Sequence, residues 1–71
     1  MDKNDLIELL RVTTVGDVTF IKSILEAENI SFSFFDESMM IKSWGAAQAR
    51  LFVHKSDVDK AVVLLKDVGM L

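Results

Sequence analysis

The chain has 71 residues, 51% of them hydrophobic, which is enough for one core over 1–71 but not for two, because so short a chain buries only about 60% of its unfolded surface. It contains no cysteine, which excludes a disulfide scaffold and a thiolate metal site and favours a reducing cytoplasm. Its net charge of −3, with eight basic residues scattered among eleven acidic ones, argues against nucleic-acid binding, for which a basic stripe is typical.

The first predicted element is a strand over 6–13, which is apolar on both sides of the pleat. Such a strand is either covered on both faces or has an apolar face that needs a partner. Its only charges are Glu8 and Arg11, and it contains neither proline nor lysine, two residues that commonly protect an edge strand from pairing.

A helix is predicted over 15–28. Thr14 suits its N-cap, and Asn29 suits its C-terminal end because asparagine tolerates left-handed backbone. Residues at helical spacing form its apolar stripe: Phe20, Ile21, Ile24, Leu25 and Ala27.

Two further strands are predicted over 30–36 and 49–55, because their residues alternate in polarity. In the earlier strand Phe35 is an aromatic residue on the side that otherwise carries serines, and the apolar side carries Ile30, Phe32 and Phe34. In the later strand Leu51 and Val53 share one side, and the other side carries Arg50, Phe52 and His54.

The last predicted helix begins after Ser56, which suits the N-cap, and ends at Gly69, which suits a left-handed residue. Its apolar stripe comprises Val58, Ala61, Val62, Leu65 and Val68. Two helices with one stripe each should cover one face of a three-stranded antiparallel sheet. A right-handed β-α-β crossover makes the first two strands parallel, and the short chain then puts the third strand between them, antiparallel to both. The predicted fold is therefore α+β, a βαββα ferredoxin-like plait that lacks the fourth strand. We expect its core to contain Phe20, Ile24, Phe32, Leu51, Val53, Val62 and Leu65.

The segment 38–48 is longer than a typical hairpin loop and is rich in apolar residues, including Met39, Met40 and Trp44. Two interpretations stand for it. It is either a satellite of the core or a lip that binds a partner or a ligand, and we expect one of Met39 and Trp44 to be partly exposed.

The sequence contains no constellation typical of an enzyme, a metal site or a cofactor site. Its single histidine, His54, lacks the further histidines or cysteines of a metal centre, and we interpret it as a partly exposed structural residue. Arg11 and Arg50 should share the open sheet face if the first and third strands pair. They would then either bind an anion or form a salt bridge with Glu8 or Asp36.

Four stretches together resemble a known family: ELLR at 8–11, LEAENI at 25–30, DESM at 36–39 and RLFV at 50–53. They are similar to small bacterial domains described as signal-transducing proteins, a group whose function is not established. The resemblance covers 5–71 and implies a βαββα plait in the bacterial cytoplasm and a regulatory role. It assigns no functional residues.

The leading hypothesis is a non-enzymatic regulatory or protein-interaction module. Its partner would be a second copy or another protein, and we expect no binding of nucleic acid or membrane. Candidate interaction residues are Phe35, Phe52, Arg11, Arg50, Met39, Met40 and Trp44. Self-association through the first strand would set Glu8 near Arg11 of the partner copy. The alternative is a domain that senses a small-molecule effector, and a third hypothesis, RNA stacking on Phe35 and Phe52, is disfavoured by the acidic charge.

Overall fold

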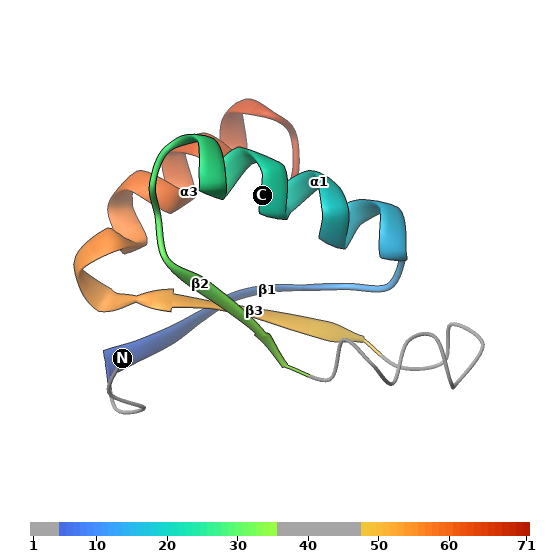
Figure 1. The fold of residues 1–71 in the computed structure, drawn as a ribbon, viewed down its shortest axis with the longest axis horizontal. Coiled ribbons are helices and arrows are strands. Elements are labelled where there is room, and N and C mark those ends of the chain that lie inside the picture. Colours follow the sequence, from blue (N-terminus) through green and yellow to red (C-terminus); the bar gives the residue numbers. More distant parts are fainter. Residues whose placement is uncertain (1–4, 36–47) are drawn as a thin grey trace.

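The computed structural model describes residues 5–35 and 48–71, and its elements follow the predicted order (Figure 1). The three strands are β1 at Leu6–Val12, β2 at Phe32–Phe35 and β3 at Ala49–His54. Helix α1 spans Val15–Ala27, and a 3₁₀ turn, η2, at Lys55–Asp57 leads into helix α3 at Val58–Asp67. Within the described ranges, no helix has the length and apolar character needed to cross a bilayer.

The strands form one antiparallel sheet in the order β1-β3-β2. The central strand is thus the last one in the chain, which confirms the predicted place of the third strand. Figure 1 shows α1 and α3 on the same side of this sheet. The fold is therefore α+β, with two helices on one face of a three-stranded antiparallel sheet, and none of the described elements covers the opposite face.

Both helices end at residues with left-handed backbone, as predicted. Asn29 has a φ of 57° and Gly69 a φ of 79°. The chain turns back at each of these residues, so the amide of the next residue reaches a carbonyl in the last helical turn: Ile30 N–H donates to Leu25 O at 2.9 Å, and Met70 N–H to Leu65 O at 2.8 Å. At the start of α1, Thr14 Oγ1 accepts from Asp17 N–H at 3.1 Å, which confirms the predicted N-cap.

The predicted cap of the last helix is wrong. Ser56 lies inside η2, and α3 begins at Val58, one residue later than predicted, with Asp57 at the N-cap, which makes no side-chain cap hydrogen bond. The physical reason is the ring of His54, whose Nδ1 accepts from Ser56 N–H at 3.1 Å. This contact caps a 3₁₀ turn that precedes the α-helix.

The core lies between the helices and the covered face of the sheet. The predictions for Leu51, Val53 and Leu65 are confirmed, since each is fully buried. The other buried hydrophobic residues are Val12, Val18, Ile21, Leu25, Ile30, Ala49 and Ala61. Three predicted core residues are only partly buried, namely Ile24, Phe32 and Val62.

The prediction that Phe20 is a core residue is wrong, because its side chain is 46% exposed. Helix α1 turns Val18, Ile21 and Leu25 toward the sheet, and successive residues of an α-helix are separated by about 100° around its axis. Phe20 therefore lies beside this buried stripe. Ala27 is also exposed, as is Val68 at the end of α3.

Strand β1 contains a bulge. Glu8 lies opposite Phe52 and Leu10 opposite Leu51, so Leu9 is an extra residue without its own opposite number on β3. A bulge shifts the alternation of side chains by one residue. The bulge explains why the sequence of β1 would be apolar on both faces if the strand were regular.

Candidate functional site

The open face of the sheet gathers the polar and aromatic side chains that the strands turn away from the helices. Residues directly opposite each other in neighbouring strands point to the same face, and every second residue of β3 is buried, from Ala49 to Val53. The other residues of β3 define what we call the open face, together with the residues opposite them on β1 and β2: Arg50, Phe52, His54, Leu6, Glu8, Arg11, Ser33 and Phe35.

An aromatic pair lies on the part of the open face formed by β2 and β3. The rings of Phe35 and Phe52 have their centroids 4.6 Å apart with 47° between their planes. Their diagonal placement follows from the register, in which Phe35 lies opposite Arg50 and Ser33 opposite Phe52. The Arg50 guanidinium lies 5.6 Å from the Phe52 centroid, within the range of a cation–π interaction. Phe52 is therefore held by a ring on one strand and a cation on its own strand.

A carboxylate links the two arginines of the open face. Arg11 Nε lies 3.3 Å from Glu8 Oε1, and Arg50 Nη1 lies 4.0 Å from the same oxygen. The salt-bridge interpretation of the sequence is therefore confirmed for Glu8, whereas Asp36 lies outside the described residues. Because all three side chains are at least one-third exposed, this cluster adds little to stability. It gives the face a mixed charge pattern beside its aromatic pair.

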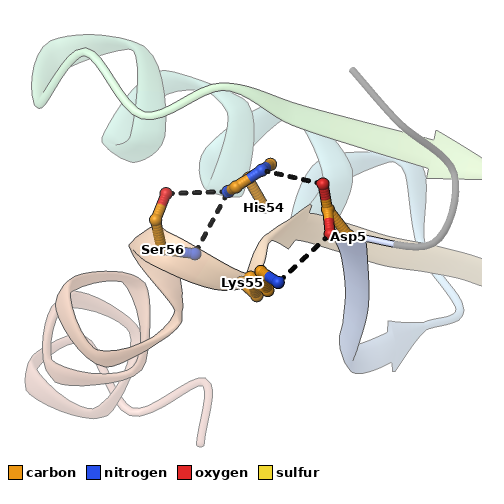
Figure 2. A network of polar contacts seen from close by, with 4 residues as sticks. All are labelled: Asp5, His54, Lys55 and Ser56. Carbon is orange, nitrogen blue, oxygen red and sulfur yellow. Dashed lines mark hydrogen bonds and ion pairs between the residues drawn. The ribbon is translucent and has the colours of Figure 1, made fainter.

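His54 joins the end of β3 to the start of β1 (Figure 2). Its Nδ1 accepts from Ser56 N–H and lies 2.7 Å from Ser56 Oγ, while its Nε2 lies 3.6 Å from Asp5 Oδ2. Lys55 Nζ lies 3.3 Å from the other oxygen of Asp5. Since Nδ1 accepts a backbone N–H, the neutral ring carries its proton on Nε2, facing the carboxylate.

These contacts contain an aspartate, a histidine and a serine, and the serine lies only two residues from the histidine along the chain. A base that activates a serine must have a free lone pair directed at its hydroxyl. Here the lone pair of His54 Nδ1 is shared between two groups of Ser56, the hydroxyl at 2.7 Å and the backbone N–H at 3.1 Å. The geometry is that of a local cap, consistent with the structural interpretation of His54. Sequence reasoning missed the Asp5 and Ser56 contacts, although a histidine two residues before a serine at a strand–helix junction was a visible signal.

The structure brings together four of the seven predicted interaction residues, namely Phe35, Phe52, Arg11 and Arg50, on the open face. The other three, Met39, Met40 and Trp44, lie outside the described residues. Over 5–35 and 48–71, no group of three or more histidine, cysteine, aspartate or glutamate side chains could hold a metal ion. The candidate site is therefore a surface of rings and mixed charges on a sheet.

Comparison with protein-family models gave no match. Searches of curated proteins and of solved structures likewise gave no match.

Proposed function

We propose that this chain is a non-enzymatic interaction module that binds a protein partner through its open face. The observation that carries the proposal is the paired rings of Phe35 and Phe52, with Arg50 over Phe52, on the sheet face opposite both helices. Aromatic and arginine side chains are the residues that most often dominate the free energy of protein–protein binding. The open face has aromatic and arginine side chains, and charges of both signs lie beside them. Such a surface suits a protein partner of mixed charge.

The proposal includes the finer fold assignment and the setting that the family resemblance implies. The strand order β1-β3-β2 is compatible with a ferredoxin-like plait that lacks the strand next to β1. The role that we propose is regulatory, in bacterial signal transduction in the cytoplasm. This part of the proposal rests on the stretches at 8–11, 25–30, 36–39 and 50–53.

The test uses a displayed library of random peptides selected against the immobilised chain. Selected peptides are then titrated by calorimetry against the parent, Phe35→Ser and Phe20→Ser. The two phenylalanines are a matched pair, since they are 37% and 46% exposed but lie on the open face and on helix α1. We expect Phe35→Ser to weaken binding by about tenfold or more, as for an interface anchor, and Phe20→Ser to leave it unchanged. Equal effects of both substitutions would contradict the proposal.

A second candidate function is the sensing of a small-molecule effector. Its supporting observation is the pair of guanidinium groups, Arg11 and Arg50, beside the flat ring of Phe52, which would suit a planar anion. Thermal unfolding across a panel of metabolites distinguishes the two functions. A stabilising metabolite whose effect is lost in Arg11→Ala would favour the sensor over the interaction module.

A further inference from the structure

Strand β1 has one edge that faces away from the rest of the sheet. In the order β1-β3-β2 it pairs with β3 alone among the residues that the structure describes. The edge runs over the seven residues Leu6–Val12. An edge of this length presents a row of backbone donors and acceptors that a further strand can use.

The bulge at Leu9 decides which side chains flank this edge. In a regular strand residues three apart point to opposite faces, but here Glu8 lies opposite Phe52 and Arg11 opposite Arg50. Both charged residues therefore lie on the open face, and the distance of 3.3 Å between Arg11 Nε and Glu8 Oε1 agrees with this placement. By the same shift, Ile7 and Val12 both lie on the side of the helices, opposite Val53 and Ala49.

We propose that the β1 edge pairs with β1 of a second copy of this chain, antiparallel about a two-fold axis normal to the sheet, with Glu8 of each copy opposite Arg11 of the other. Such an axis keeps both copies' open faces on one side, so residues opposite each other must share a face. Without the bulge, Glu8 and Arg11 would point to opposite faces and this register would be excluded. With the bulge, strand β1 is complementary in charge to β1 of a second copy related by the two-fold axis.

The same register also matches side chains on the side of the helices. It places Ile7, which is 41% exposed, opposite Val12 of the partner copy, which is 5% exposed. The joined edge would therefore have apolar pairs on the side of the helices and two ion pairs on the open side. Because each copy contributes the same strand, association through this edge closes at two copies. We take a second copy as the partner of this edge because the two-fold rotation brings Glu8 of each copy opposite Arg11 of the other.

This inference rests on the proposed function, because it names one partner of the interaction module, but it uses a different surface. Its central test is a pair of charge reversals, Glu8→Arg and Arg11→Glu, followed by sedimentation at low ionic strength, where screening is weakest. Each variant alone would face two like-charge contacts across the axis, so we expect its self-association to be weakened by roughly tenfold or more. An equimolar mixture should recover the dimer, because every contact between the two variants joins opposite charges.

Recovery in the mixture distinguishes an interface from a role in folding, since each variant keeps its own fold unchanged when mixed. Circular dichroism before mixing establishes that both variants are folded. A parent chain that sediments as a monomer at every concentration up to about a millimolar overturns the inference. So does a mixture that associates no better than the two variants separately.

A second pair of variants separates this inference from the proposed function. Ile7→Lys places a charge on the β1 edge, and Phe35→Lys places the same charge on β2, at the opposite side of the sheet, where exposure is similar at 37%. We expect Ile7→Lys to abolish the dimer and to keep peptide binding, and Phe35→Lys to do the reverse. A dimer that survives Ile7→Lys and is lost in Phe35→Lys overturns the edge inference and moves the interface to the open face.

Discussion

The orientation of helix α1 yields a prediction that distinguishes two neighbouring residues. The perturbations are Ile21→Ala and, as a matched control one residue away, Phe20→Ala. Ile21 is fully buried against the sheet, whereas Phe20 is 46% exposed. A stripe interpreted from the sequence alone includes both residues, so it predicts a large loss of stability from either truncation. The structure predicts a large loss from one of them only.

The magnitudes follow from burial. Ile21→Ala removes about three buried carbon atoms at roughly 0.8 kcal/mol each and leaves a cavity, so the free energy of unfolding should fall by about 3 kcal/mol. Phe20→Ala loses only about half of a burial worth roughly 2 kcal/mol, and the better helix propensity of alanine returns about 0.5 kcal/mol. Its net cost should be about 0.5 kcal/mol. A chain of 71 residues has a total stability of roughly 4–11 kcal/mol, so the first loss is severe and the second is minor.

The assay is urea unfolding followed by far-ultraviolet circular dichroism. With a slope of about 1 kcal/mol per molar urea for so small a domain, the midpoint should fall by roughly 3 M for Ile21→Ala and by roughly 0.5 M for Phe20→Ala. The slope itself should stay constant if both variants unfold in one step. Equal midpoints, or a larger shift for Phe20→Ala, would refute the placement of α1 on the sheet.

Three further predictions concern the ends of the helices and are checked by thermal unfolding. Thr14→Ala removes the acceptor for Asp17 N–H and should cost about 1 kcal/mol, whereas Thr14→Ser should cost little. Asn29→Gly should be neutral or stabilising at a φ of 57°, whereas Asn29→Val should cost about 1–2 kcal/mol because a β-branched residue is strained there. His54→Ala leaves Ser56 N–H without its acceptor and should cost about 0.5–1.5 kcal/mol; His54→Asn, which keeps a cap acceptor, should recover most of this loss. Equal melting temperatures within any of these pairs would contradict the corresponding role.

The candidate surface could be predicted in part. Alternation of polarity along β3 was sufficient to separate Arg50 and Phe52 from Leu51 and Val53, because every second residue of a strand shares a face. The same rule put Phe35 on the open face. The contact between the rings of Phe35 and Phe52 depends on the register between two strands, which alternation within one strand does not specify. Glu8 was among the predicted salt-bridge partners, but only the pairing of β1 with β3 selects it.

The sequence by itself determined the order of the elements, the N-cap of α1 and the left-handed residues that end α1 and α3. These features depend on interactions within about one helical turn, such as the Thr14 cap and the left-handed residues Asn29 and Gly69. Such local interactions can be predicted from the sequence because both partners lie within about one turn of each other along the chain.

Only the tertiary structure decided the rotation of α1, the bulge at Leu9 and the facing of Glu8 and Arg11. An apolar stripe is wider than the contact that a small sheet can cover, so packing chooses which of its residues are buried. Likewise, a strand that is apolar on both sides permits more than one facing, and pairing with β3 selects the bulged one. These outcomes are set by residues distant in sequence, since the partner strand and the helix layer decide them together.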